Sequence, residues 1–550
     1  MSDLFSIASN YVDEVAAHRP DIATQIGVPG YDHLWPDTSP EGAAATAEVV
    51  DRYRKLIAPY LDSDDTWQRH GARVLDGFLM KKQSDYEEGD RHYELRHVAG
   101  LQEDVRDIFD LMDTSSNEAW DNISTRLETA AQPLSGWRAT LEEGRALGHI
   151  VSRRQAGSAL DQLRHLAGPD SKWLGLARDA EQDAPDVADR VSRAVDEGRR
   201  AAGEFADYVE QEYLPHAVEA DGVGRERYLS AADGFLGMRI DPLETYEWGW
   251  SEVRRIQQAM TDVAAELDPS KTLAEVITML DTSAEYAVPS QAAFAEFIQE
   301  RQDQALRHLE GAHFVVPEEI KHVTVNLVPP GAALGAYYLQ PSEDFNRPGG
   351  IWYSFGERQQ IPLWGEVSTA YHEGFPGHHL QIGTAMAQQE NLTRAHRLLI
   401  WYSGYGEGWA LYTERLMDEL GYFEKPEYRL GYYSAQQLRA CRVVIDIGCH
   451  LGLALPGDSA INPGGTWDYQ TAVEILHQVA AQPRDVSESE AKRYLGWPGQ
   501  AISYKVGERF IVGLREETKK KQGAAFNLRE FHRSLLEGGE VRLDYLTSQT

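Results

Sequence analysis

The sequence predicts a mainly α-helical protein into which one small β-sheet is inserted. Apolar residues recur at helical spacing from residue 66 to about 310, as in Leu75, Phe78 and Leu79. Short runs rich in β-branched and aromatic residues, broken by proline and glycine, are confined to residues 312–356. These two patterns are typical of amphipathic helices and of short strands, respectively. Beyond the short runs the helical period returns.

The N-terminal region, residues 1–310, is predicted to be entirely helical. Residues 3–18 and 41–62 read as amphipathic helices, and the second opens with Ser39-Pro40-Glu41, a capping residue with proline in the first turn. Glycine and proline mark the breaks between later helices, for example at Gly168-Pro169. No sequence repeat or low-complexity linker interrupts the pattern.

The C-terminal region, residues 311–550, is predicted to form one compact unit with the first. Its expected parts are a sheet of three or four strands at 312–356, histidine-bearing helices at 366–420 and further helices at 426–540. The fold class is therefore a large helical shell with a small inserted sheet.

Composition limits the classes of partner. With 550 residues, 42% of them hydrophobic, the chain can bury one very large core or several ordinary ones. A net charge of −34 argues against nucleic-acid and anionic-membrane partners, because binding phosphate requires Lys and Arg. No window approaches eighteen apolar residues, so no membrane span is expected.

Two observations lead us to expect a cytoplasmic protein. The first residues, Met1–Ile7, contain no basic region followed by an apolar block, so no secretory signal is evident. Cys441 and Cys449 lie about 12 Å apart along a helix, too far for a disulfide. Free thiols suit a reducing compartment. The oligomeric state is not encoded in these patterns, and a homodimer is left open.

The stretch with the most chemistry is a histidine cluster. Three histidines and a glutamate lie within residues 372–379. His372 followed directly by Glu373 is how zinc hydrolases begin their metal helix, with an imidazole ligand beside a carboxylate base. In the usual H-E-x-x-H spacing the second histidine comes four residues later, but this position is Pro376.

The second ligand must therefore come from His378 or His379. On a straight helix neither spacing closes a site with zinc–nitrogen bonds of about 2.0–2.1 Å. The insert Gly374–Gly377 contains a proline between glycines, and we interpret it as a broken turn that carries the second histidine back toward the first. The alternative is a histidine cluster in a turn that binds no metal.

A second motif follows on the next predicted helix. Glu407 comes just after Gly404-Tyr405-Gly406, and Glu414 lies two helical turns further on the same face. A carboxylate there is what a two-histidine zinc site needs to reach three protein ligands with one position left for water.

These two motifs, H-E-G-F-P-G-H-H-L-Q from His372 and G-E-G-W-A-L-Y-T-E from Gly406, resemble the bacterial proteins catalogued as domain of unknown function 885. That family is grouped with metallopeptidases that use glutamate as third zinc ligand. The resemblance implies a zincin-like catalytic unit with one Zn²⁺ per chain, held by His372, His378 and Glu407. It also implies that Glu414 is a partner behind the ligands, the alternative being an ordinary salt bridge.

Downstream, the helix from Arg439 carries a polar stripe on an otherwise apolar surface, formed by Arg439, Arg442, Asp446 and His450. Burying such a stripe unpaired costs several kcal/mol, so it must face a polar cavity or partner charges. Arg442 or Arg439 could bind a substrate carboxylate, and His450 could donate to a developing oxyanion. Alternatively the stripe is a closed network between helices, the role we favour for Asp446.

Further candidates lie near the C-terminus and in the predicted sheet. Related peptidases place a tyrosine after the third ligand to stabilise the tetrahedral intermediate, and Tyr504 matches in order, with Tyr353 and Tyr405 as competitors. Lys505 and Tyr353 are predicted to contact substrate. The strand Gly349–Tyr353 is expected either to offer its edge to an extended substrate backbone or to form a capping hairpin.

We therefore expect a zinc-dependent hydrolase of peptides or small amides, a carboxypeptidase or oligopeptidase with a deep site, in which Glu373 is the general base. One alternative is a non-haem iron oxygenase using the same two-histidine, one-carboxylate set. It is disfavoured because hydrolysis requires the adjacent glutamate and oxygen chemistry does not. A non-catalytic scaffold with a structural metal is the other alternative, which the broken spacing keeps open.

Overall fold

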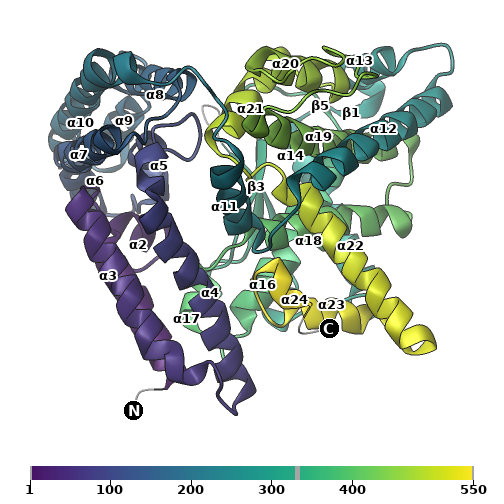
Figure 1. Cartoon of the computed structure of the whole chain (residues 1–550), viewed down its shortest axis with the longest axis horizontal. Helices are drawn as coiled ribbons and strands as arrows, with labels where there is room; N and C mark the ends of the chain where they lie inside the picture. The colour runs from purple at the N-terminus through teal and green to yellow at the C-terminus, as the bar shows by residue number, and fades with distance from the viewer. Residues whose placement is uncertain (1–2, 329–334, 548–550) are drawn as a thin grey trace. The chain divides into compact units, whose positions relative to one another are not determined.

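The computed structural model describes residues 3–328 and 335–547, and it divides into two units that we describe separately. Unit 1 comprises Met1–Gly222, Thr393–Leu399 and Leu495–Trp497, and unit 2 comprises Val223–Leu392, Ile400–Tyr494 and Pro498–Thr550. The mainly α fold class is confirmed (Figure 1). The division falls near residue 222, whereas the sequence pattern predicts a regional boundary near residue 310.

Unit 1 is helical. Its helices are α1 (Leu4–His18), α2 (Pro20–Ile26), α3 (Pro40–Ile57), α4 (Thr66–Glu88), α5 (Leu101–Asp107), α6 (Asn117–Glu128), α7 (Ala131–Leu147), α8 (Arg153–Ala167), α9 (Trp173–Asp183), α10 (Ala188–Tyr208) and α17 (Arg394–Leu399). The predicted start of α3 is confirmed: the Ser39 side chain accepts a hydrogen bond from the Gly42 N–H, and Pro40 occupies the first turn. The core forms where α10 packs against α6 to α9, around Trp120, Trp137 and Trp173.

Helix α17 joins unit 1 from far along the chain and packs against α1 and α4 (Figure 1). The Arg394 guanidinium lies 2.8 Å from the Asp13 carboxylate of α1. The His396 ring lies 5.6 Å from the His70 ring of α4. Unit 1 therefore includes a helix, α17, that lies outside the first 222 residues of the chain.

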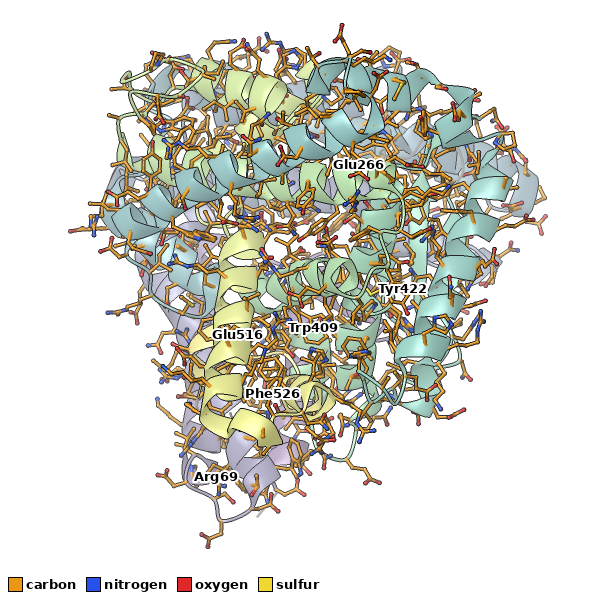
Figure 2. The ribbon with its side chains drawn as sticks, turned by 90° about the vertical axis from the view of Figure 1, so that its right-hand side faces the viewer. Arg69, Glu266, Trp409, Tyr422, Glu516 and Phe526 are labelled. Carbon is orange, nitrogen blue, oxygen red and sulfur yellow. The ribbon has the colours of Figure 1, made fainter. Side chains whose placement is uncertain are left out.

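Unit 2 holds the remaining elements, with α21 ending at the boundary. Its helices are α11 (Arg225–Leu236), α12 (Pro242–Leu267), α13 (Leu273–Thr282), α14 (Gln291–Leu309), α15 (Glu366–Glu373), α16 (His378–Ala387), α18 (Ser403–Glu419), α19 (Pro426–Leu451), α20 (Tyr469–Glu474), α21 (Arg484–Gly496), α22 (Ser503–Gln522), α23 (Leu528–Leu536) and α24 (Leu543–Leu546). Two long pairs dominate, α12 with α19 and α18 with α22. Figure 2 shows Trp409 of α18 beside α22, the helix that carries Glu516.

The α18–α22 pair crosses at glycines. A Cβ atom added at Gly408 would lie 2.6 Å from the Gly507 Cα, and one added at Gly507 would lie 2.0 Å from the Gly404 carbonyl oxygen. Any side chain at these positions would push the helices apart. The crossing fixes the first turns of α18, the helix that carries Glu407.

The inserted sheet has three strands in the order β2 (Thr324–Leu327), β4 (Gly350–Ser354), β3 (Gly335–Leu339). A two-stranded pair joins β1 (Ala287–Val288) to β5 (Ile361–Pro362). The predicted sheet is therefore present, although its first strand begins at Thr324 rather than near residue 312.

Of the two roles left open for the strand Gly349–Tyr353, the structure excludes the substrate-binding edge. Strand β4 is central, paired in parallel with β2 and antiparallel with β3. Its backbone groups are thus used on both sides and cannot receive a substrate strand. The outer side of β2 is covered by Gln299 of α14, which accepts from the Val325 N–H and donates to the Val323 carbonyl. Among the described residues, β3 pairs only with β4.

Candidate metal centre

The Gly374–Gly377 insert breaks the metal segment into two helices, as the sequence predicts. Helix α15 ends at Glu373 and α16 begins at His378. The chain turns so tightly that a Cβ atom at Gly377 would lie 1.9 Å from the His372 carbonyl oxygen. Glycine is required there because any side chain would overlap the preceding turn.

Two neighbouring helices hold this turn in place. The Trp409 indole N–H of α18 donates to the Pro376 carbonyl at 3.0 Å. Gln302 of α14 donates to the Ala370 carbonyl at 2.8 Å and accepts from the Phe375 N–H at 2.6 Å. The bonds fix the turn on both sides of its proline, so the two histidines that flank it are positioned by the core.

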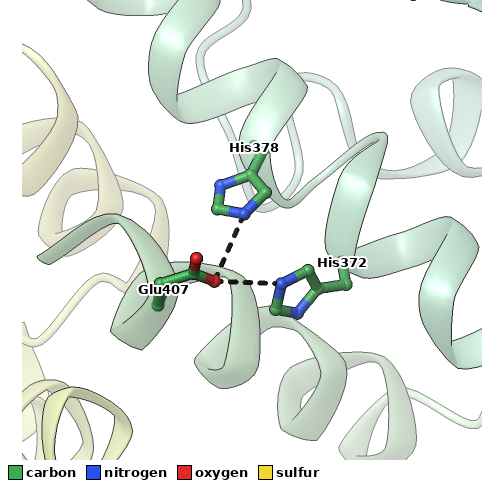
Figure 3. Close-up of side chains that lie close together, drawn as sticks. All are labelled: His372, His378 and Glu407. Carbon is green, nitrogen blue, oxygen red and sulfur yellow. Dashed lines mark hydrogen bonds and ion pairs between the residues drawn. The ribbon is translucent and has the colours of Figure 1, made fainter. Parts of the chain in front are cut away.

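The break brings His372, His378 and Glu407 together (Figure 3). The Glu407 Oε2 atom lies 3.3 Å from His372 Nε2 and 3.5 Å from His378 Nε2. Ligands at the corners of a tetrahedron with bonds of about 2.1 Å lie about 3.4 Å apart. Both distances from Glu407 match that spacing, and the three donor atoms all lie within 4.8 Å of one another, so their chemistry and separation suit a divalent metal ion such as zinc.

Glu414 lies behind His372 and orients it. His372 Nδ1 lies 2.8 Å from Glu414 Oε1, and the Ser368 hydroxyl donates to Glu414 Oε2 at 2.6 Å. With Nδ1–H donating to this carboxylate, Nε2 is the nitrogen directed at Glu407. Carboxylates commonly fix metal-binding histidines in this way.

Negative charge is concentrated around the cluster. Burial would lower the pKa of His372, but hydrogen bonds to Glu407 and Glu414 outweigh it and raise that pKa to about 10. The two imidazoles hold the pKa of Glu407 well below its usual range, against the opposing effect of burial. The site thus stabilises a positive charge at its centre, which a divalent cation would supply.

His379, the other candidate ligand, points elsewhere. Its Nε2 donates to the Ile320 carbonyl at 2.8 Å, and its Nδ1 accepts from the Tyr338 hydroxyl at 3.1 Å. Burial lowers the pKa of His379 to about 4. Both of its nitrogens are therefore engaged in structural contacts, whereas His378 directs Nε2 at Glu407.

Glu373 lies beside the donor set with its carboxylate unengaged. It makes no hydrogen bond or ion pair with any residue of 3–328 or 335–547. Burial raises its pKa, and the neighbouring imidazoles of His372 and His378 oppose that rise. A partly buried carboxylate without a fixed partner is suited to accept and release a proton.

Tyr504 also lies at the cluster. Its ring stacks on His372, with centroids 6.3 Å apart and planes 19° apart. Its hydroxyl has no hydrogen-bond partner within the described chain. Burial raises the pKa of Tyr504 and the Glu407 charge adds to this effect, so the phenol stays protonated as a donor. The competitor Tyr405 instead donates to the Leu535 carbonyl.

The structure does not bring His450 to this cluster. His450 Nε2 donates to the Tyr494 carbonyl at 3.1 Å, and its Nδ1 accepts from the Val223 N–H. Neighbouring Asp446 accepts from the Tyr228 hydroxyl at 2.9 Å. These contacts do not support the predicted oxyanion role of His450. They match the alternative, a closed hydrogen-bond network between helices.

Lys505 and Tyr353 are likewise placed in the core. Lys505 lies 2.5 Å from the Glu508 carboxylate and 3.3 Å from that of Glu252. Tyr353 packs its ring against Phe294, with centroids 4.8 Å apart, and is 1% exposed. Neither position supports the substrate contact predicted for these residues, because a sequence pattern cannot distinguish a polar group facing a site from one paired in the core.

Several residues that build the site were missed by sequence reasoning. Ser368 donates to Glu414, the partner of His372, and Gln302 holds the turn between α15 and α16. No sequence motif marks either residue, and Gln302 lies on α14, far from the turn in sequence. Trp401 is 43% exposed with its ring 6.0 Å from that of His378. Trp409 also holds the turn, and its place in the G-E-G-W motif beside Glu407 was the signal that could have identified it.

Comparisons with known proteins agree on the fold. A family model described as "Bacterial protein of unknown function (DUF885)" matches residues 20–549. The structure is similar to that of a putative lipoprotein from Colwellia psychrerythraea, with a TM-score of 0.84 and 21% identity over 99% of this chain and 97% of that one. It is also similar to a putative lipoprotein of unknown function from Shewanella oneidensis, with a TM-score of 0.74 and 17% identity over 100% and 99%. A comparison with curated proteins finds no match.

These structures correct one expectation. Both are described as lipoproteins, which contradicts the cytoplasmic location expected from the sequence. That expectation rested on the pattern of Met1–Ile7 and on the free thiols, and the separation of two cysteines along a helix reflects folding rather than a cellular address. Within the described residues, no helix combines the length and apolar character needed to cross a membrane.

Proposed function

Because this chain belongs to the DUF885 family of bacterial proteins of unknown function, whose description assigns no reaction, we propose its function from its site: a zinc-dependent hydrolase that cleaves peptide bonds. The observation that carries this proposal is the donor set of His372, His378 and Glu407, whose ligand atoms lie within 4.8 Å of one another, next to the unengaged carboxylate of Glu373. A structural metal site normally has four protein ligands, whereas three leave a position for reactants.

The metal would be held by His372 Nε2, His378 Nε2 and one carboxylate oxygen of Glu407. Imidazole nitrogens and a carboxylate oxygen are ligands that zinc prefers, and the concentrated negative charge favours a divalent cation. When bound, zinc polarises a carbonyl group and lowers the pKa of water.

The chain's own residues would manage the protons. The Glu373 carboxylate accepts a proton from the water that attacks the scissile carbonyl carbon, and then delivers that proton to the leaving amine nitrogen as the C–N bond breaks. The Tyr504 hydroxyl donates a hydrogen bond to the carbonyl oxygen as negative charge develops there, an interaction worth several kcal/mol in enzymes of this kind. Glu414 keeps the His372 ring oriented throughout.

The position of Glu373 also favours hydrolysis over the oxygenase alternative. Oxygen activation at a two-histidine, one-carboxylate site uses the three ligands and open positions. It has no use for an adjacent free carboxylate whose pKa is raised by burial. A proton acceptor of this kind is what the addition of water to an amide requires.

The test is the Glu373→Gln variant. The amide is nearly isosteric but cannot accept a proton, so zinc content and fold should be unchanged. Peptide cleavage should fall by roughly 10²–10⁴-fold, the usual effect of losing a general base. Zinc content, melting temperature and cleavage of a peptide library, read by mass spectrometry, are measured on one preparation. Glu390→Gln, an exposed change shortly after α16, is the matched control.

Two outcomes would overturn the proposal. One is a zinc-loaded parent protein that cleaves no member of the library. The other is a zinc-loaded Glu373→Gln variant that cleaves peptides as fast as the parent. A loss of zinc in that variant would instead give Glu373 a structural role and remove it from the proposed mechanism.

A further inference from the structure

One arginine beside the site carries a charge that no carboxylate of the described residues neutralises. Arg439 lies on α19, and its Nη1 donates to the Ala435 carbonyl of its own helix at 3.3 Å. Its Nε is buried and has no hydrogen-bond partner in the described chain. Within the same residues, no carboxylate lies within ion-pair distance of Arg439.

The neighbouring arginines are different. Arg442, one turn further along α19, donates to the Glu490 carboxylate at 2.8 Å and to the Tyr494 hydroxyl at 2.9 Å. Arg493 also binds Glu490, at 3.0 Å. One carboxylate therefore serves both of these arginines, and the charge of Arg439 remains in excess.

Arg439 is close to the groups that would perform the reaction. Its guanidinium lies 5.8 Å from the centre of the Tyr504 ring, the ring that stacks on His372. Its positive charge also acts on Glu373, where it opposes the effect of burial on the pKa of that carboxyl. The centre thus has an acidic side that would hold a cation and a basic side with an unpaired guanidinium.

We propose that Arg439 binds a carboxylate of the substrate, specifically the free C-terminal carboxylate of a peptide. This inference rests on the proposed function and deepens it: the protein would remove residues from carboxyl ends. A partly buried arginine without an anion is unfavourable, and its planar fork of N–H donors matches a carboxylate. Binding the terminal carboxylate next to Glu373 and Tyr504 would place a peptide bond close to that terminus against the metal-facing residues.

A carboxylate can also come from an Asp or Glu side chain of the substrate, so the probes separate the two sources. An equimolar library of N-acetylated tetrapeptides is prepared once with free C-terminal carboxylates and once as C-terminal amides. In each set, half of the peptides contain glutamate. The parent protein should cleave the free acids roughly 10- to 100-fold more efficiently in kcat/KM than the amides, as expected for a hydrogen-bonded charge pair. Glutamate within an amide should not restore cleavage.

Arg439→Gln should remove this preference. Cleavage of the free acids should fall to the level of the amides, so that the ratio of the two kcat/KM values approaches one. Arg439→Lys should retain part of the preference, because a point charge replaces the fork. Arg429→Gln is the control, since Arg429 lies on the same helix but pairs with Glu266 at the surface.

A binding measurement gives a readout that does not depend on turnover. In the Glu373→Gln background, calorimetry should show that the free-acid library binds more tightly than the amide library, and that Arg439→Gln abolishes the difference. If the parent cleaves acids and amides equally, the inference fails and the proposed hydrolase stands. Preference for glutamate-containing amides would also overturn it, by assigning Arg439 to a side chain. Failure to cleave either library would overturn the proposed function itself.

Discussion

At the scale of single residues, the two adjacent histidines of the site differ in what their nitrogens contact. His378 Nε2 faces Glu407, whereas His379 uses both nitrogens on Ile320 and Tyr338. His378→Ala should therefore lose zinc, while His379→Ala should keep most of it and lose stability instead. Metal analysis and thermal unfolding of both variants check this. Retained zinc in His378→Ala together with lost zinc in His379→Ala would contradict the assignment.

The carboxylate behind His372 gives a graded prediction. Glu414→Gln keeps the shape of the side chain but removes the charge that accepts from His372 Nδ1 and Ser368. Zinc affinity should fall by roughly 10- to 100-fold without loss of the site, as for other groups that hold metal-binding histidines. Competition with a chelator measures it. Glu419→Gln, further along α18 and exposed, should leave the affinity unchanged.

The sequence predicted the donor residues because their order is local. His372, Glu373 and Glu407 lie in short motifs whose chemistry can be read from residue type and spacing. Arg439, Arg442 and His450 could not be told apart in the same way, because they share one helix face. Whether each is paired depends on Glu490, Tyr494 and Val223, which come from distant parts of the chain.

At the scale of elements, the broken helix depends on a single close approach. Gly377→Ala would place a Cβ atom against the His372 carbonyl, so the turn must open and move His378. We expect a loss of stability of at least about 1–3 kcal/mol, as for overpacked sites, together with a loss of zinc. Chemical denaturation and metal analysis measure both. Gly365→Ala, before α15, has no atom within 4 Å and should change neither.

The network that anchors α19 predicts a dependence on pH. Burial raises the pKa of Asp446 to about 7 from 3.8, although bonds from Tyr228 and Gly499 oppose it. Between these values the folded state holds a proton that the unfolded state has released, so stability falls as pH rises. The contribution of the neutral carboxyl is complete below pH 3.8 and lost as pH passes 7.

Asp446→Asn should remove this dependence. The amide oxygen can still accept from Tyr228 and Gly499, but the side chain no longer ionises. Relative to the parent, the variant should become more stable from pH 5 to about pH 7 in denaturant titrations, and the difference should level off above pH 7. Asp458→Asn, which changes an exposed carboxylate on a loop, is the control. Parallel stability curves for the parent and Asp446→Asn would show that Asp446 is ionised when buried.

Element positions also show where sequence patterns stop being informative. The runs that form β2, β3 and β4 were recognised because alternation and β-branched residues are local properties. The strand order β2-β4-β3 was not predicted, because strand pairing joins segments that are not neighbours in sequence. A central strand and an edge strand of this length have similar composition, so the sequence pattern left open whether Gly349–Tyr353 lies at an edge.

At the scale of the whole molecule, metal binding should add to stability. Glu407 belongs to the donor set, Glu373 lies beside it and Glu414 lies behind His372, so a bound cation would offset the negative charge concentrated there. Any ligand of the native state stabilises it by mass action. A chelator should therefore lower the melting temperature of the parent protein and leave that of a zinc-free His372→Ala variant unchanged. An unchanged melting temperature of the parent, with zinc removed, would contradict a site of this affinity.

The fold class was predictable at this scale because helical periodicity is summed over hundreds of residues. The division into two units was not predictable, because the amino-acid composition does not change at residue 222. Both units are built from the same amphipathic helices, and the segments that return to unit 1 at Thr393–Leu399 and Leu495–Trp497 are short.

Helix α17 sets an order of events during synthesis. N-terminal domains commonly fold first as the chain emerges from the ribosome. Here α1 and α4 are made early, but the helix that covers them ends at Leu399, after most of the candidate metal centre has been translated. The first 222 residues therefore leave the face of α1 and α4 that α17 covers exposed until about half of the second unit has been synthesised. A chain cut at residue 222 should expose that face and aggregate, and supplying residues 393–399 through a flexible linker should restore a soluble fold.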